Sequence, residues 1–401
     1  PAVQISNARA TSHACPNCGS AGMTIFYEKS GAPVHSVVLL PTLEQALAYP
    51  TGDIALGFCE RCGFVSNLAY DANLQDYATD YESTQSYSPT FNAFAHRLAQ
   101  RLIDRYDLHG KEIVEIGCGQ GEFLYLLCEL GDNRGTGFDP AYRQETVDSP
   151  ARDRVQIVAD YYSERYAQHN ADLVVCKMTL EHIDRTGDFV RTVRRAVGDR
   201  HDTVIFFQVP NGEYVMRDVA FWDVYYEHCS YFSEASLAHL FRSSGFEVLD
   251  LAAEYDDQYL MIEARPVAGP VAAPADDAGA LARMRGHVAH FAAHQREVID
   301  GWRDELTRLH ADGQRVVIWG GGSKGVAFLT TVGIRDQIAY VVDINPRKQG
   351  MFMAGTGQQI VGPEFLREVQ PQVVVVMNPI YCDEIGEQLA ALGVRARLLP
   401  V

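Results

Sequence analysis

The sequence predicts an α/β protein whose main unit is a doubly wound sheet, with a small cysteine-rich module before it and a smaller α/β unit after it. Three observations support this fold class. From Lys111 onward, apolar runs of strand length alternate with helical patterns. A glycine-rich turn follows the first of these runs. Beyond Pro210, two apolar runs separated by residues 254–258 predict an antiparallel hairpin. The strands expected before the hairpin cover residues 112–117, 134–139, 154–159, 171–177 and 202–209.

Length and composition limit the classes of protein. The chain has 401 residues, more than the roughly 250–300 at which one core stops growing, so we expect two or three domains. We place them at 1–75, 76–268 and 269–401. An apolar content of 47% and a charged content of 21% are typical of a soluble protein. The net charge is −18, and lysine and arginine form no cluster in the sequence. Both observations disfavour nucleic acid as a partner. With no apolar run of signal or membrane-spanning length, we expect a cytoplasmic monomer or homodimer that is not bound to membranes.

Two C-x-x-C-G knuckles in the N-terminal module predict a structural zinc site. Their cysteines are Cys15, Cys18, Cys59 and Cys62. Four thiolates fill the tetrahedral coordination of zinc and leave no position for a substrate. The alternative is a pair of redox motifs, which would more often open a helix of a thioredoxin-like unit. His35 is a spare ligand candidate, and the apolar run 36–40 between the knuckles is predicted to form a strand.

Residues 70–90 are rich in tyrosine, Tyr81 among them, and have no clean helical or strand period. The segment is expected to be a loop or short helices that join the module to the next domain. Its side chains either cover a ligand site or fill space at a domain boundary. An amphipathic helix is predicted at 91–106.

The glycine turn predicts a site for a small anionic cofactor. Glu115, Gly117, Gly119 and Gly121 stand between an apolar run and a helical pattern. Glycine lets the backbone approach a ligand closely, and the amide groups at a helix start attract negative charge. The G-x-G-x-G spacing differs from the G-x-G-x-x-G of dinucleotide sites. A turn that only packs is the alternative.

The E-x-G-x-G-x-G string resembles motif I of the class I S-adenosylmethionine (SAM) methyltransferases, and the hairpin resembles strands six and seven of their sheet. The resemblance implies that SAM binds at the turn. Asp139, which closes the second strand, is then placed to accept both ribose hydroxyls. Asp160 and Tyr161, which follow the third strand, are placed to meet the adenine.

Residues 223–233 are dense in hydroxyl, carboxylate and imidazole groups and predict the chemical centre. His228 is the natural general base near neutral pH, and Glu227 is a carboxylate that could orient it or raise its basicity. Glu181 and His182, after the fourth strand, form a second candidate pair. The alternative is that these histidines cap helices or bind backbone groups.

The C-terminal third follows a linker at 266–277 and a helical pattern at 280–309, with strands predicted at 315–319, 339–343 and 373–376. This pattern indicates a Rossmann-like unit. Gly320, Gly322 and Gly325 satisfy G-x-G-x-x-G, and Asp343 follows at a suitable distance. Lys324 precedes a glycine, so this is not a P-loop. NAD binding, contact with the phosphate or nucleotide of a substrate, and simple packing all remain open.

Taken together, the knuckles, the string Tyr225-x-Glu227-His228-x-Ser-Tyr-Phe and the C-terminal G-x-x-x-K-G resemble the sugar C-methyltransferases, which methylate C-3 of nucleotide-linked 4-keto sugars. The resemblance implies that His228 removes the proton next to the ketone. It also implies that Tyr225, Glu227 and His182 surround the sugar and that Tyr81 joins them. The chain departs from the family at 82–84, 208–211 and 378–381.

Three functions follow as hypotheses. The first is SAM-dependent C-methylation next to a ketone, for which a base and donors to the enolate oxygen are needed. The second is O- or N-methylation of another small metabolite. The third is a zinc scaffold or an NAD-binding protein.

Overall fold

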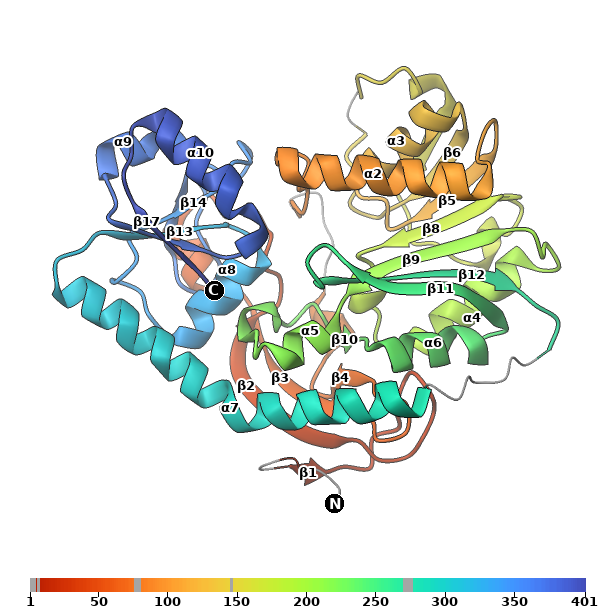
Figure 1. The fold of residues 1–401 in the computed structure, drawn as a ribbon, viewed down its shortest axis with the longest axis horizontal. Helices are drawn as coiled ribbons and strands as arrows, with labels where there is room; N and C mark the ends of the chain where they lie inside the picture. The colour runs from red at the N-terminus through yellow and green to blue at the C-terminus, as the bar shows by residue number, and fades with distance from the viewer. Residues whose placement is uncertain (1–4, 6–7, 76–80, 145–146, 270–276) are drawn as a thin grey trace.

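A computed structural model describes residues 5, 8–75, 81–144, 147–269 and 277–401 of the chain. Within these residues the backbone forms three sheets, from the N-terminal, central and C-terminal parts of the sequence (Figure 1). The N-terminal sheet lies between the other two and shares a core with each of them.

The N-terminal sheet has five antiparallel strands in the order β1-β2-β3-β4-β10. They are β1 (Arg9–Ala10), β2 (Thr24–Pro33), β3 (Thr51–Phe58), β4 (Val65–Asn67) and β10 (Ser230–Tyr231), and α1 (Leu43–Leu47) lies between β2 and β3. The last strand comes from a distant part of the chain, because Ser230 pairs with Ser66 and Tyr231 with Val65. This pairing fixes the end of the predicted chemical segment 223–233 on the N-terminal sheet.

The central sheet has seven strands in the order β11-β12-β9-β8-β5-β6-β7. They are β5 (Glu112–Ile116), β6 (Arg134–Phe138), β7 (Val155–Val158), β8 (Leu173–Lys177), β9 (Val204–Pro210), β11 (Phe246–Glu254) and β12 (Tyr259–Pro266). Strands β5 to β9 run parallel, and β12 pairs antiparallel with β9. The strand order reverses at β5, and ligands bind at the carboxyl ends of strands beside such a reversal.

Helices cover both faces of the central sheet. They are α2 (Pro89–Tyr106), α3 (Glu122–Gly131), α4 (Thr186–Val197) and α6 (Glu234–Ser243), with α5 (Gly212–Arg217) near the sheet edge. Leu173 and Val175 of β8 share a core with α2 and α3, whereas Val174 and Cys176 share a core with α4 and α6. Because strand side chains alternate between faces, both faces of β8 must be apolar, which explains its unbroken apolar run. Figure 1 shows the two helix layers on opposite sides of the sheet.

The C-terminal sheet is parallel, in the order β15-β14-β13-β16-β17. Its elements are β13 (Val316–Trp319), α8 (Ser323–Val332), β14 (Tyr340–Val342), β15 (Gln359–Val361), α9 (Leu366–Val369), β16 (Val373–Val376), α10 (Cys382–Leu392) and β17 (Arg397–Pro400). The long helix α7 (Asp277–Ala311) leads into it along the N-terminal sheet. Phe291 of α7 packs edge-on against Phe26 and Tyr27 of β2.

The structure confirms the predicted doubly wound sheet, its closing hairpin and the strands of the C-terminal unit. The prediction of a strand at 36–40 is wrong. In the sheet β3 pairs with β2, and the stretch 36–40 makes only an isolated bridge between Val38 and Tyr81. The domain limits remain predictions. Residues 76–80, beside the first limit, and 270–276, in the predicted linker, lie outside the described residues.

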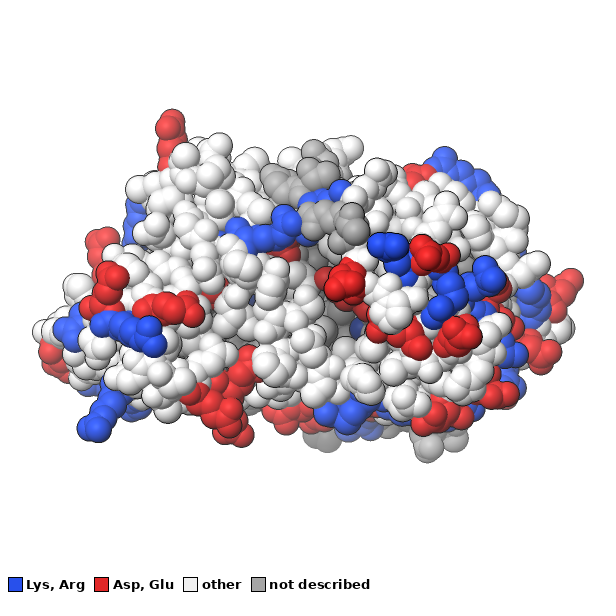
Figure 2. Space-filling model, turned by 90° about the horizontal axis from the view of Figure 1, so that it is seen from above, with Lys and Arg blue, Asp and Glu red and all other residues white. Residues whose placement is uncertain are grey.

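Charged side chains of both signs are dispersed over the face seen from above, with uncharged side chains across its middle (Figure 2). Among the described residues, none of the helices combines the length and hydropathy that crossing a bilayer requires.

Candidate active site

A cavity of about 1040 Å³ opens at the carboxyl ends of the central strands. Its wall includes Gly117 and Asp139 from the central sheet, Tyr81 from the segment before α2, and Gly322 and Lys324 from the C-terminal unit. Residues from distant parts of the sequence therefore share one site.

The glycine turn between β5 and α3 forms one end of the cavity. Gly117, Gly119 and Gly121 have φ values of +69°, +57° and +89°, a region that side chains disfavour. A Cβ on Gly117 would lie 2.0 Å from the Thr179 Oγ1, and one on Gly121 would lie 2.5 Å from the Ile157 Cδ1. At Gly119 the nearest such atom is 3.9 Å away, so this backbone faces open space. The outer glycines permit packing and the middle one leaves room for a ligand.

Asp139 lies directly after β6 and beside this turn. Its Oδ2 accepts from the Gly119 amide at 2.8 Å and its Oδ1 from the Ala141 amide at 2.8 Å. Burial raises the pKa of Asp139, although these two amide bonds oppose the rise. Each carboxylate oxygen has a second lone pair, so the fixed carboxylate can still accept hydroxyl groups.

Asp160 and Tyr161 lie at the end of β7 and line the same cavity. The Asp160 carboxylate contacts the Tyr166 hydroxyl and the Arg165 guanidinium. Tyr161 is 63% exposed. Their contact with adenine remains a prediction.

Glu115 of β5 and Lys177 of β8 line the cavity from neighbouring strands, and the charge of each affects the pKa of the other. Burial raises the pKa of Glu115 to about 8, and Lys177 opposes this rise. Burial likewise lowers the pKa of Lys177 to about 8, opposed by Glu115. The Lys177 Nζ lies 3.6 Å from the centre of the Phe123 ring. Sequence reasoning missed Lys177, for which a lysine closing an apolar strand was the available signal.

His228 lines the same cavity. Its imidazole is 4.1 Å from the Tyr225 ring and 4.9 Å from the His182 ring, measured between ring centres. Burial lowers the pKa of His228 well below its usual value, and the charges of His182 and Lys324 lower it further. The imidazole is therefore neutral at physiological pH, the form in which it can accept a proton.

Glu227 does not contact His228 among the described residues and does not line the cavity. Its Oε1 accepts from the Ser36 amide at 3.1 Å and the Ser36 hydroxyl at 2.6 Å. Its Oε2 accepts from the Tyr81 hydroxyl at 2.9 Å and lies 3.4 Å from the His35 Nδ1. Burial alone would raise the pKa of Glu227, but His35 and the other donors outweigh it and lower the pKa. Glu227 thus holds Tyr81 in place.

His35 and Ser36 are site residues that the sequence did not reveal. The predicted strand at 36–40 is replaced by an irregular segment, whose Ser36 amide is free to bind Glu227. His35 packs against Tyr81, with 5.8 Å between ring centres, and is not close to the cysteines as a spare ligand would be.

Glu181 is the carboxylate nearest to His228. Its Oε1 lies 4.0 Å from the His228 Nε2. Burial, together with the charge of Glu227, raises the pKa of Glu181 to about 8. Burial lowers the pKa of the neighbouring His182. The structure thus brings together Tyr81, Glu181, His182, Tyr225 and His228 on one cavity wall.

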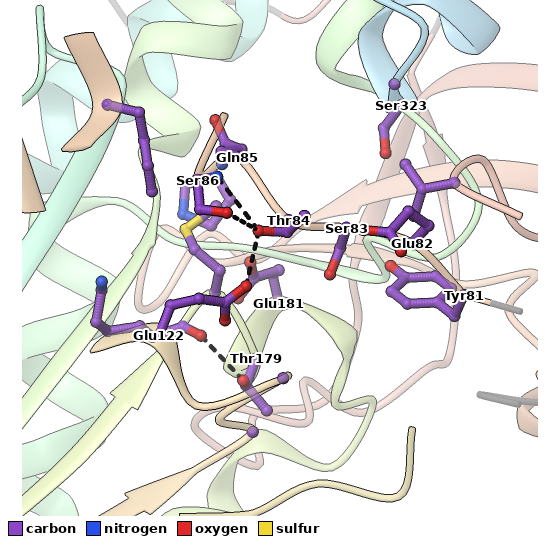
Figure 3. A pocket seen from close by; sticks show the side chains of 18 of the residues that line it. Tyr81, Glu82, Ser83, Thr84, Gln85, Ser86, Glu122, Thr179, Glu181 and Ser323 are labelled. Carbon is purple, nitrogen blue, oxygen red and sulfur yellow. Dashed lines mark hydrogen bonds between the residues drawn. The ribbon is translucent and has the colours of Figure 1, made fainter. Parts of the chain in front are cut away.

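Residues 81–88 cross the cavity between the central and C-terminal units. Figure 3 shows Tyr81 to Ser86 along the pocket, with Glu122 near one end and Ser323 near the other. Thr84 donates to Glu122 at 2.7 Å, whereas Ser88 donates to Glu384 of α10 at 2.8 Å. Glu82, at a position where the chain departs from the sugar enzymes, pairs with Arg143 at 3.1 Å. The segment lines the cavity.

The C-terminal glycine run forms the remaining wall. The Gly321 amide donates to the Asp343 Oδ2 at 3.0 Å, and the Lys348 Nζ lies 3.6 Å from the same oxygen. The Lys324 Nζ binds the Asp223 Oδ2 at 2.5 Å. Helix α8 therefore begins at the cavity with two lysines beside it.

The four knuckle cysteines suit a zinc ion. Their sulfurs all lie within 4.8 Å of one another, with 3.8 Å between Cys15 and Cys62 and 3.6 Å between Cys18 and Cys59. A tetrahedron with Zn–S bonds of about 2.3 Å has edges of about 3.8 Å. Gly19 and Gly63 close the two turns by donating to the Cys15 and Cys59 carbonyls.

Comparisons with known proteins agree with this geometry. A family model described as a methyltransferase domain matches residues 91–251, and one described as a C-methyltransferase C-terminal domain matches residues 274–397. The chain is 28% identical to the C-methyltransferase NovU of Streptomyces niveus over 344 residues, which are 82% of this chain and 80% of NovU.

Among solved structures, the chain is similar to a 1,6-didemethyltoxoflavin-N1-methyltransferase of Burkholderia thailandensis, with a TM-score of 0.32 and 20% identity over 43% of this chain and 79% of that one. It is also similar to the magnesium protoporphyrin IX methyltransferase of Synechocystis PCC 6803, with a TM-score of 0.35 and 14% identity over 44% of this chain and 84% of that one.

The two matched domains and the relative NovU agree with the motif I turn at the head of the seven-stranded sheet. The chain is therefore a SAM-dependent methyltransferase whose C-terminal part matches a C-methyltransferase domain.

Proposed function

We propose that the enzyme methylates a carbon next to a ketone, at C-3 of a nucleotide-linked 4-keto deoxysugar, with His228 as the general base. The observation that carries the proposal is the buried, neutral imidazole of His228 beside Tyr225 and His182, in the same cavity as the glycine turn. NovU, a named C-methyltransferase, supports carbon as the methylated atom.

The donor site is assigned to the glycine turn. Gly119 offers open backbone, Asp139 offers a fixed carboxylate for the ribose, and Asp160 and Tyr161 lie where the adenine is expected. Bound SAM supplies an electrophilic methyl group. The protein's contribution is to hold the acceptor carbon in line with that methyl group, since positioning supplies much of the rate in such transfers.

The acceptor site is assigned to the wall that carries His228. His228 takes the proton from the carbon next to the ketone, and the electron pair of the broken C–H bond moves toward the ketone oxygen. Burial raises the pKa of Tyr225 well above its usual value, so its hydroxyl keeps its proton and can donate to the developing enolate oxygen. Tyr81 forms part of the same wall, and because its hydroxyl proton is donated to Glu227, its oxygen can act only as a hydrogen-bond acceptor toward the sugar.

The nucleotide of the acceptor is assigned to the C-terminal wall. Lys324 and Lys348 line the cavity beside the start of α8, and cations together with helix-start amides suit phosphate groups. Asp343 accepts from the Gly321 amide, which orders this turn before a ligand arrives. The same proposal includes a structural zinc ion at the four cysteines, for which the sulfur separations provide the support.

Solvent exchange tests the proposal. The purified enzyme is incubated in D₂O with S-adenosylhomocysteine and thymidine-diphospho-4-keto-6-deoxyglucose, and deuterium at the carbons beside the ketone is followed by mass spectrometry and NMR. Ketone chemistry predicts exchange by the native enzyme and none above background by His228→Asn. O- or N-methylation needs no exchange, so its complete absence in the native enzyme would contradict the proposal. Calorimetry with SAM and with NAD tests the donor, and tight NAD binding without SAM binding would overturn it.

A further inference from the structure

Glu181 is a buried acid without a hydrogen-bonding partner. It lies in the single turn η4 (Leu180–His182) that follows β8, and its side chain is 1% exposed. Neither of its carboxylate oxygens has a hydrogen-bond partner in the part of the chain that the structure describes. Folded proteins rarely retain such a group, because removing a carboxyl group from water without a partner is unfavourable. Its presence on a cavity wall therefore points to a function.

The position of Glu181 relative to His228 is fixed from both sides. Its Oε1 faces the His228 Nε2 at 4.0 Å. The Cys229 thiol donates to the Glu181 carbonyl at 3.6 Å, and the Ser230 hydroxyl donates to the Ile183 carbonyl at 2.7 Å. The segment that carries the imidazole is thus attached to the turn that carries the carboxyl group. With Nε2 directed at Glu181, Nδ1 is the ring nitrogen that has no carboxylate beside it.

We propose that Glu181 is the positioning residue for His228: its carboxylate, 4.0 Å from Nε2, orients the imidazole electrostatically so that Nδ1 accepts the proton of the substrate. This inference depends on the proposed function, in which His228 is the base. In the step, the C–H bond breaks, its electron pair stays on the acceptor as the enolate, and the proton forms an N–H bond at Nδ1. The resulting imidazolium charge is balanced by the Glu181 carboxylate. No group is oxidised or reduced.

The charged and titratable groups around this pair set its pH dependence. His182 lies on the same turn as Glu181, Glu227 lies on the segment of His228, and Lys324 reaches the site from α8. Burial raises the pKa of Glu181 to about 8, so the carboxylate forms as the pH rises through that value. Only the carboxylate form balances an imidazolium. Proton abstraction is therefore expected to become faster as the pH rises through about 8.

The first test measures the D₂O exchange described above, from pH 6 to 9, for the native enzyme, Glu181→Gln and Glu181→Asp. Glu181→Gln is expected to lower the exchange rate about 100-fold and to remove the rise near pH 8, since an oriented base typically contributes about 100-fold or more. The KM for the sugar nucleotide is expected to stay unchanged, and Glu181→Asp is expected to restore part of the rate. Exchange by Glu181→Gln at the native rate across this range would overturn the role of Glu181 and leave His228 as the base.

The second test needs no substrate. Histidine ring ¹⁵N shifts are followed by NMR from pH 6 to 9, with His228→Asn identifying the His228 signals. Ionisation of Glu181 is expected to shift the His228 ring signals near pH 8 in the native enzyme, but not in Glu181→Gln. The control is Glu263→Gln, which changes a buried carboxylate that does not line the cavity and should keep the shift near pH 8. No His228 titration in the native enzyme would overturn the inference. If the His228 signals shift as Glu181 ionises but no deuterium enters the sugar nucleotide, the interaction between Glu181 and His228 is supported and the ketone chemistry is overturned instead.

Discussion

The Tyr81 hydroxyl donates to the Glu227 Oε2 at 2.9 Å, although the two residues are 146 positions apart in the sequence. Glu227 also binds Ser36 and contacts His35, so one buried carboxylate holds three parts of the chain together. Tyr81 lines the cavity and Glu227 does not. This part of the cavity wall is thus supported by a carboxylate that does not itself line the cavity.

Removing this hydroxyl should weaken catalysis without removing the base. Tyr81→Phe is expected to lower kcat/KM roughly 10-fold, because a hydrogen bond to a charged group contributes about 1.5 kcal/mol. Glu227→Gln should have a similar effect, and the double variant should lose little more than either single one. Steady-state kinetics on the four proteins measure the coupling. Fully additive losses would show that the two residues act independently.

Replacing the base should have a larger effect. His228→Asn is expected to lower the rate of C-methylation by a factor of about 100 to 10,000, the usual contribution of a general base. SAM binding should be unchanged, because His228 belongs neither to the glycine turn nor to the strand ends that carry Asp139 and Asp160. Calorimetry and a methylation assay measure the two quantities. A variant that retains most of its activity would exclude His228 as the base.

The glycine turn offers a matched pair of substitutions. Gly119→Ala should fold with a loss of about 1 kcal/mol, because φ is +57° and its Cβ meets open space, but it should bind SAM weakly. Gly117→Ala should destabilise the fold more strongly, since its Cβ would lie 2.0 Å from the Thr179 Oγ1. Urea unfolding and calorimetry separate the two outcomes. Native SAM affinity in Gly119→Ala would place the donor elsewhere.

Metal removal should lower stability. Treatment with a strong chelator is expected to release one zinc ion per chain and to lower the Tm, because a structural metal binds the folded state and not the unfolded one. Metal analysis and calorimetry measure this, with Cys382→Ala, a cysteine outside the cluster, as the control variant. A native chain without bound metal would contradict the zinc assignment.

Lys29 should make stability depend on pH. Its Nζ donates to the Thr330 and Thr331 hydroxyls of α8, and burial lowers its pKa to about 7. Below about 7 the lysine is charged in both the folded and unfolded states, whereas at higher pH only the unfolded chain keeps the proton. The free energy of unfolding should therefore rise from about pH 7 toward pH 10 relative to Lys29→Met. An equal difference between the two proteins at both pH values would contradict this.

The sequence was sufficient to predict the central sheet because its signals are local. The alternation of strands and helices, the turn at Gly117 to Gly121 and the closing hairpin each depend on neighbouring residues. The same applies to the two knuckles and to the density of polar groups around His228. The resemblance to the SAM methyltransferases, from which SAM was predicted as the methyl donor, depends on the same local patterns.

What the sequence could not show depends on distant pairing. The run 36–40 resembles a strand in isolation, but β3 occupies the edge of β2 and Ser36 binds Glu227 instead. The position of the carboxylate nearest to His228 has the same origin, because adjacency in sequence does not decide which carboxylate faces its ring, and in the structure Glu181 lies 4.0 Å from it. The sequence did not reveal Lys177 as a site residue, because Glu115, whose charge acts on its pKa, lies on another strand.

Because β10 pairs with β4, the segment that carries His228 is attached to the backbone that follows the second cysteine knuckle. β4 begins shortly after Cys62, and the Ser233 hydroxyl beyond β10 donates to the Gly63 carbonyl at 3.2 Å. A change of geometry at these cysteines would therefore be transmitted through β4 and β10 to the backbone that carries His228.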